Sequence, residues 1–84
     1  MEIDTAKIDE DVLALLYLTS FADSSDRKLS VMRAWKNHDW DAMQRLHEAG
    51  LISNPRGQAK SVVITEEGYR RAEELFRRKY GKAG

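Results

Sequence analysis

Residues 39–69, DWDAMQRLHEAGLISNPRGQAKSVVITEEGY, contain the start and stop signals of several successive elements. Asp39 can cap a helix, because its carboxylate accepts the free N–H groups of the first turn. Apolar residues then recur at helical spacing up to Gly50, where a left-handed glycine ends a helix. With Gly50 as that residue, Leu46 and Leu51 take the two positions that touch in a Schellman motif. We therefore predict a helix that stops directly before Gly50, with a positive φ at this glycine.

A short β-hairpin is expected after this helix. Leu51–Ser53 can begin a strand, and Ser61–Ile64 is short and rich in β-branched residues, which is typical of a strand. Between them, Asn54–Gly57 has proline at the second and glycine at the fourth position of a turn. Thr65 is the predicted N-cap of a last helix, which runs from about Glu66 to Tyr80.

Two further helices are predicted before this stretch. The first has Asp9 as its expected N-cap, and its segment Val12–Leu18 is apolar on nearly all sides, which is typical of a helix buried on several sides. The second is predicted to begin at Ser25 or Asp26. Its inward residues are predicted to be Leu29, Met32 and Trp35.

These elements predict one domain over residues 1–84, with loose ends at 1–7 and 82–84. Its class is mainly α with a small β-hairpin (α+β), in the order helix-helix-helix-strand-strand-helix. The predicted core takes one apolar face from each element: Leu15, Leu16, Trp40, Leu46, Val62, Ile64, Tyr69 and Phe76. Gly68, in the first turn of the last helix, costs about 1 kcal/mol relative to alanine, so we expect a close helix contact at this glycine.

Composition limits the function. The chain has no cysteine and a formal net charge of zero, from 14 Lys+Arg and 14 Asp+Glu. It therefore contains no disulfide framework and no thiolate zinc site. The acidic N-terminus is unlike a signal peptide, and no apolar run is long enough to cross a bilayer, so we expect a cytoplasmic protein without membrane association.

The charge is distributed unevenly along the chain. Residues 1–26 carry a net charge of −6 and residues 27–84 a net charge of +6. Such asymmetry is typical either of a nucleic-acid surface or of local helix electrostatics.

Several short phrases carry a family resemblance: LALLYL at Leu13–Leu18, AWK at Ala34–Lys36, DW at Asp39–Trp40, RLHEAGLI at Arg45–Ile52 and KSVVITEEG at Lys60–Gly68. The chain resembles a winged helix-turn-helix domain and, more narrowly, a small bacterial family of unknown function. The winged-helix resemblance implies that the helix before Gly50 reads DNA and that the hairpin is the wing. The narrower resemblance implies no activity.

Duplex DNA is the partner that the winged-helix resemblance implies. On the predicted reading helix, Gln44 has the chemistry to read adenine and Arg45 to read guanine, although Arg45 is also spaced to pair with Asp41 at i,i+4. Asp41 and Glu48 also point outward and oppose a polyanion, so we expect weak, sequence-independent binding. The candidate nucleic-acid-binding residues are Arg33, Lys36, Gln44, Arg45, Arg56 and Lys60.

The other candidate features have simpler explanations. The basic run of the last helix is predicted to form four i,i+4 ion pairs: Glu66–Arg70, Glu67–Arg71, Glu73–Arg77 and Glu74–Arg78. His38 and His47 match no metal or catalytic motif, and Trp35 and Trp40 are expected to pack the turn between them rather than to stack on bases. We therefore predict no enzyme, no catalytic residues, no cofactor and no metal site.

The alternative function is a protein-interaction or assembly module that does not bind DNA, with a protein partner still to be identified. A domain of this size cannot surround a helix that is apolar on all sides. We therefore also expect a homodimer that uses part of Val12–Leu18.

Overall fold

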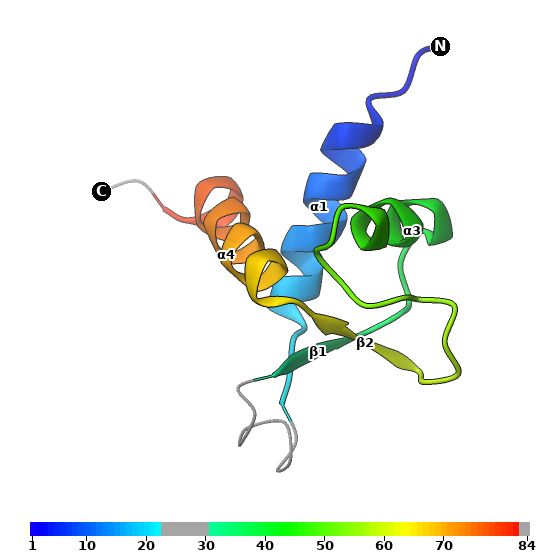
Figure 1. Ribbon diagram of the computed structural model, residues 1–84. Coiled ribbons are helices and arrows are strands. Elements are labelled where there is room, and N and C mark those ends of the chain that lie inside the picture. Colours follow the sequence, from blue (N-terminus) through cyan, green and yellow to red (C-terminus); the bar gives the residue numbers. More distant parts are fainter. Residues whose placement is uncertain (23–30, 83–84) are drawn as a thin grey trace.

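The computed structural model describes residues 1–22 and 31–82 (Figure 1). These residues form three helices and a two-stranded antiparallel sheet, which confirms the predicted α+β class. Along the chain the elements are α1 (Thr5–Leu18), β1 (Met32–Trp35), α3 (Trp40–Glu48), β2 (Ser61–Ile64) and α4 (Glu66–Tyr80). Within these residues, no helix is both long and apolar enough to cross a membrane.

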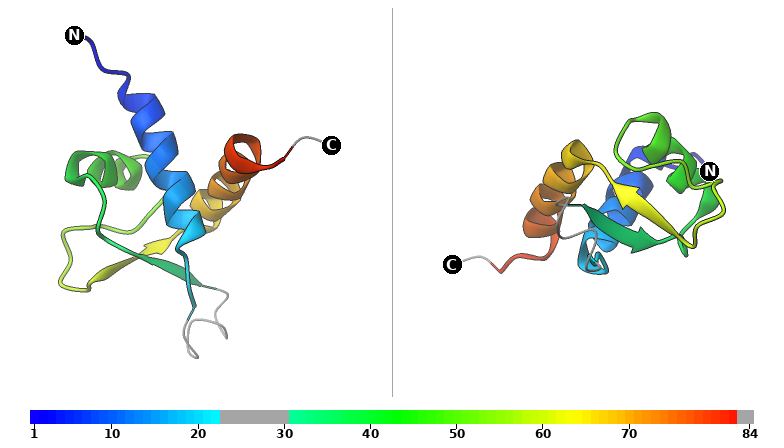
Figure 2. Two further views of the ribbon diagram at one scale, coloured as in Figure 1. Left: turned by 180° about the vertical axis from the view of Figure 1, so that it is seen from behind. Right: turned by 60° about the horizontal axis from the view of Figure 1, so that its bottom comes forward.

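Helix α1 lies in the middle of the domain, with α3 on one side and α4 on the other (Figures 1 and 2). Its inward residues are Val12, Leu13, Ala14 and Leu16, all of them buried. The helix begins earlier than predicted, because Asp4 caps it by accepting the N–H of Lys7 at 3.2 Å. Asp9 is therefore not the N-cap but lies inside the helix. Of the predicted loose end, only residues 1–4 lie outside the helix.

Helix α3 begins and ends as the sequence predicts. The Asp39 side chain accepts the N–H of Ala42 at 3.0 Å, which makes it the N-cap. At the other end, the N–H of Leu51 donates to the carbonyl of Leu46 at 3.0 Å, and Gly50 has a φ of +79°. This is the hydrogen bond and the left-handed residue of a Schellman motif. The prediction for Gly50 is confirmed.

The two strands come from segments that are far apart in the chain. β1 pairs antiparallel with β2, in a register that places Met32 opposite Ile64 and Trp35 opposite Ser61. The predicted partner of β2, Leu51–Ser53, contributes only an isolated bridge between Ile52 and Ile64. The backbone N–H of Ser53 also donates to the carbonyl of Val63 at 2.8 Å, so the expected local pairing is present in part, while the ladder itself is formed with the more distant β1.

The predicted second helix is wrong for Met32 and Trp35, which belong to β1. Ser25, Asp26 and Leu29 lie outside the described residues. The spacing of these apolar residues is helical, but β1 also alternates between the two faces of the sheet, and pairing with β2 satisfies its backbone. A helix-turn-helix places a helix directly before the turn that leads to the reading helix. Here β1 precedes that turn, so the described residues do not confirm a winged helix.

A close backbone contact joins the end of α3 to the start of α4. A Cβ added to Gly68 would lie 1.9 Å from the carbonyl oxygen of Leu51. The same oxygen accepts the backbone N–H of Thr65 at 3.0 Å, and the Thr65 hydroxyl accepts the N–H of Gly68 at 2.9 Å as the N-cap of α4. The close contact expected at Gly68 is therefore present, but with the backbone after α3 rather than with a helix.

The hydrophobic core follows the prediction in part. Leu16, Leu46, Val62 and Ile64 are buried together. Tyr69 packs against this cluster, and Tyr17 forms ring contacts with Tyr69 at 5.3 Å and Phe76 at 5.2 Å between centroids. The prediction is wrong for two residues, because Trp40 is 44% exposed and Leu15 36% exposed. Trp40 is the first residue of α3 and lies between the exposed residues Asp39 and Asp41.

Candidate nucleic-acid interface

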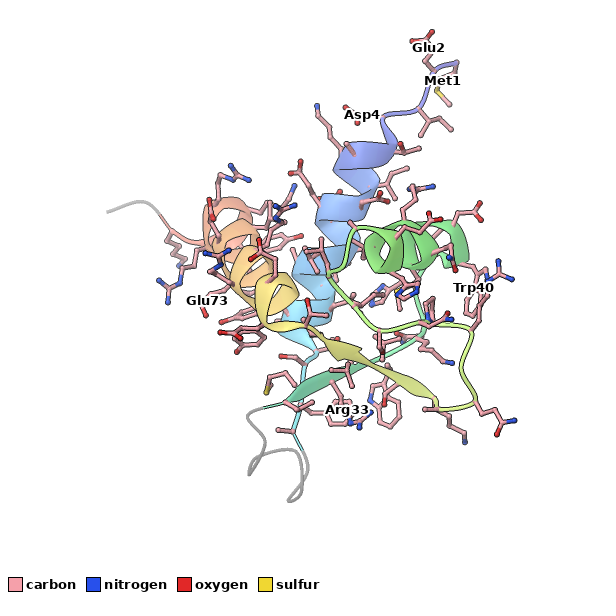
Figure 3. The ribbon with its side chains drawn as sticks, viewed as in Figure 1. Met1, Glu2, Asp4, Arg33, Trp40 and Glu73 are labelled. Atoms are coloured by element: carbon pink, nitrogen blue, oxygen red, sulfur yellow. The ribbon has the colours of Figure 1, made fainter. Side chains whose placement is uncertain are left out.

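The sheet has one face against the core and one outer face. Ala34 and Val62 point inward and are fully covered, while Arg33 and Trp35 alternate to the other side of β1. Figure 3 shows Arg33 on the side of the strand that is turned away from α1. Trp35 is 49% exposed on this face. The outer face therefore combines an arginine with a large, half-exposed aromatic ring.

Phe21 extends this outer face. It forms an antiparallel bridge with Arg33, in which each backbone N–H donates to the other residue's carbonyl at 2.8–2.9 Å. Its ring lies 4.9 Å from that of Trp35 between centroids, with 30° between the ring planes. This tilted stack is a favourable aromatic arrangement. The sequence does not predict this pair, because the spacing of Met32 and Trp35 fits a helix.

The loop of residues 53–60 is fastened to the end of β1 by Lys36. The Nζ atom of Lys36 donates to the carbonyls of Pro55 and Gly57, both at 2.8 Å. The backbone N–H of Lys36 also donates to the carbonyl of Lys60 at 3.2 Å. Lys36 therefore has a structural role in this conformation, because its ammonium group is shared by two loop carbonyls.

The same loop presents Arg56 and Lys60 to solvent. The backbone N–H of Arg56 donates to Oδ1 of Asn54 at 2.9 Å, which shapes the turn. Its side-chain Nε donates to Oε1 of Gln44 on α3 at 3.2 Å. Gln44 is thereby connected to the loop and is not positioned alone as a base-reading side chain.

Of the six predicted residues, the structure brings four together around this loop: Lys36, Gln44, Arg56 and Lys60. Arg33 lies on the adjoining outer face of β1. Arg45 is separate, because its guanidinium forms an ion pair with Asp9 of α1, with Nη2 2.8 Å from Oδ1. The hydrogen bonds to Asp9 raise the pKa of Arg45 above its ordinary value.

The charged residues of the two strands and of the loop before β2 are all basic. Residues 31–38 and 51–65, which include both strands and the loop, contain four basic residues and no acidic residue. In contrast, α3 exposes the acids Asp41 and Glu48. The basic residues of the strands and loop therefore attract a negatively charged phosphate backbone, whereas the acids of α3 repel it.

Four of the five basic residues of α4 have acidic partners among the described residues, whereas the predicted pair Glu74–Arg78 is not formed. Arg77 pairs with Glu73 at 3.0 Å and Arg71 with Glu67 at 3.8 Å, which confirms two of the predicted i,i+4 pairs. Arg70 pairs with Glu67, at i,i+3, instead of with Glu66. Lys79 reaches across to α1 and lies 2.8 Å from Oδ1 of Asp11.

The histidines have different environments. Nδ1 of His47 lies 3.1 Å from the carbonyl oxygen of Ile52, close enough for a hydrogen bond. His38 has its Nε2 buried without a hydrogen-bond partner, and burial lowers the pKa of its imidazole. Among residues 1–22 and 31–82, no three His, Cys, Asp or Glu side chains are grouped so that they could hold a metal ion.

The two tryptophans do not pack the turn between β1 and α3 as expected. Trp35 lies on the outer face of the sheet, and Trp40 lies at the outer end of α3 (Figure 3). The alternation of Met32, Arg33, Ala34 and Trp35 is the sequence signal that could have placed Trp35 beside Arg33.

Comparison with known proteins covers nearly the whole chain. The model of a family described as a domain of unknown function (DUF6429) matches residues 4–82. The chain is similar to an uncharacterized protein, y4hR, of Sinorhizobium fredii (strain NBRC 101917 / NGR234), with 53% identity over 78 residues, which are 93% of this chain and 95% of that protein. No solved structure matches the chain. The resemblance to a family of unknown function is confirmed.

Proposed function

Because this chain belongs to the DUF6429 family, whose function is unknown, we propose its function from its own surface: a small cytoplasmic nucleic-acid-binding module that performs no catalysis. The observation that carries the proposal is the charge of the strands and their loop. Four basic residues and no acidic residue occur in residues 31–38 and 51–65. We call the part of this region formed by the half-buried Arg33 and the exposed Trp35, Arg56 and Lys60 the strand–loop surface.

Binding is proposed to depend mainly on phosphate contacts. Arg56 and Lys60 are exposed on a loop that Lys36 fastens to the end of β1, so their positive charges are held next to the strand that carries Arg33. Neutralised phosphates release counterions, which is the main source of affinity in sequence-independent binding. Lys36 is proposed to contribute by holding the loop rather than by binding phosphate itself.

The proposal departs from the winged-helix mode of binding. Arg45 forms an ion pair with Asp9, and the side-chain oxygen of Gln44 accepts a hydrogen bond from Arg56. The exposed charged residues of α3, Asp41 and Glu48, are both acidic. α3 therefore lacks both a free donor pair for guanine and a free donor–acceptor pair for adenine. We therefore propose that α3 supports the loop and does not enter a major groove.

Fluorescence anisotropy with labelled random duplex and single-stranded DNA at several salt concentrations tests this function. The double variant Arg56→Ala/Lys60→Ala is expected to weaken binding and to flatten the slope of log K against log salt, by about one unit per lost phosphate contact. Arg70→Ala/Arg71→Ala is the matched control, because it removes the same charge from residues that pair with Glu67. It is expected to change the slope little. Absence of binding at low salt, or equal effects of both variants, would refute the proposal.

A second candidate, a protein-interaction module, is supported by a different observation. Leu15 and Leu18 of α1 are 36% and 59% exposed, although the rest of the apolar segment is covered. Two leucines at i,i+3 form a short apolar stripe on one helix face. We propose that this stripe forms a homodimer contact.

A further inference from the structure

The outer face of the sheet has an aromatic surface that core packing does not explain. Phe21 and Trp35 stack on each other with ring centroids 4.9 Å apart, and about half of Trp35 remains exposed. The inner face of the same sheet is filled by Ala34, Val62 and Ile64, so the fold does not require an aromatic ring outside. A stacked aromatic pair with one ring half-exposed offers a flat apolar face on which a planar group can stack.

We infer that the stacked pair Phe21–Trp35 is a platform for an unpaired base, and that the substrate class of this module is single-stranded nucleic acid. This inference rests on the proposed function. Bases in a duplex are stacked on one another, with their phosphates outward, so a protein ring reaches a base face only where the strand is single. Every base has such a face, and the expected binding is therefore tolerant of sequence.

The surroundings of the platform fit a strand of this kind. Arg33 bridges to Phe21 and belongs to the same row of the outer face, so a cation lies next to the rings. Lys60 directly precedes β2, whose first residue, Ser61, pairs with Trp35. The positive charges of Arg33 and Lys60 thus lie near the two ends of the β1–β2 ladder, where they favour the neighbouring phosphates of a bound strand. The absence of acids from residues 31–38 and 51–65 favours a polyanion over a neutral or basic peptide.

Tryptophan fluorescence measures this contact directly. The chain has two tryptophans, and Trp40→Phe leaves Trp35 as the only one. Trp40 is half-exposed, so this change is expected to preserve the fold. Titration of this variant with unlabelled oligothymidylate is expected to quench Trp35 emission at saturation, whereas a duplex of the same charge is expected to quench it much less.

Affinity provides the second measurement, on the otherwise unchanged chain. Trp35→Ala is expected to weaken binding to oligothymidylate roughly tenfold or more, with little effect on duplex affinity or on the salt slope. Trp35→Phe keeps an aromatic face and is expected to recover most of the loss. The thermal melting of each variant is compared first, so that a loss of fold is not mistaken for a loss of stacking.

The outcomes separate this inference from the proposed function. If oligothymidylate and the duplex both bind with salt dependence, but Trp35→Ala changes the affinity for neither, the platform is refuted. The proposed binding of phosphates by the strand–loop surface then stands. If neither binds at low salt, both are refuted. If polyglutamate displaces the strand and quenches Trp35 as strongly as oligothymidylate does, an acidic protein is the better partner and the platform inference is overturned.

Discussion

Arg45 of α3 forms two parallel hydrogen bonds with Asp9 of α1. Its Nη2 donates to Oδ1 at 2.8 Å and its Nε donates to Oδ2 at 2.8 Å. The two side chains are only 35% and 20% exposed, so this bidentate pair is partly shielded from water. The finding gives both residues a role in joining two helices, where the sequence had suggested a helix cap and a base-reading arginine.

We expect Asp9→Asn and Arg45→Gln each to lower the melting temperature, because each change leaves a charged or polar partner incompletely satisfied. The double variant should lose less than the sum of the two single losses, since the residues act as one pair. Nucleic-acid affinity should change little in Arg45→Gln. A large loss of affinity at unchanged stability would instead return Arg45 to the binding site.

Gly68→Ala is expected to destabilise the domain. Alanine improves the intrinsic helix propensity by about 1 kcal/mol. Its Cβ, however, would lie 1.9 Å from the carbonyl oxygen of Leu51, and a backbone oxygen cannot move aside as a side chain can. We expect the clash to dominate, with a net loss of about 1–3 kcal/mol measured by urea unfolding. Gly57→Ala is the control, because its Cβ would meet the nearest atom at 3.6 Å and should be tolerated.

Gly50→Val tests the stop of α3 by a different mechanism. No atom lies within 4 Å of a Cβ at this position, so the space is open, but the φ of +79° is unfavourable for a side chain. The expected cost is about 1–2 kcal/mol, which lowers the melting temperature by several degrees in a domain of this size. Gly50→Asn should cost clearly less, because asparagine tolerates the left-handed conformation. Equal melting temperatures for all three proteins would contradict this account.

His38 is expected to make stability depend on pH. Burial lowers the pKa of its imidazole from the ordinary value of 6.5, so the unfolded chain binds this proton more readily than the folded domain. The contribution of His38 to stability is therefore fully present above pH 6.5 and is lost as the pH falls below this value. The free energy of unfolding, measured by urea titration between mildly acidic and neutral pH, should fall less steeply on acidification in His38→Asn than in the wild type.

Light scattering tests the homodimer at α1. We expect a mass of two chains at tens of micromolar, because Leu15 and Leu18 leave an apolar stripe uncovered. Leu15→Lys/Leu18→Lys should give a monomer with a similar far-ultraviolet circular dichroism spectrum. A wild-type mass of one chain at this concentration would refute the dimer.

The sequence was most informative where a local rule decides the structure. The N-caps at Asp39 and Thr65 and the left-handed Gly50 each need only neighbours within a few residues, and all three are confirmed. The bounds of α4 agree with the prediction for the same reason, because cap and apolar periodicity both lie within the helix itself.

The prediction was wrong where residues far apart in the chain determine the secondary structure. Met32 and Trp35 are three residues apart, and this spacing fits a helix. Their segment has only four residues, which is too short for the two-residue period of a strand to be the stronger signal. Pairing with β2 makes it a strand. In the candidate site, the exposed positions of the basic loop residues Arg56 and Lys60 could be predicted from their charge and from the turn residues around them. The Phe21–Trp35 stack could not be, since it depends on the strand assignment.

The origin of the sheet also has a kinetic consequence. Each ladder contact joins a residue near position 33 to one near position 63, with all of α3 and its loop between them. Such a sheet cannot form first, as a hairpin can, because closing this long segment costs entropy before any ladder bond compensates for it. Helix α3 and its stop at Gly50 bring the two strands toward each other, so we expect the sheet to assemble after α3 has formed. Until that moment Trp35 and Val62 are unpaired, so the nascent domain is most exposed to aggregation through the same strands that later form its outer surface.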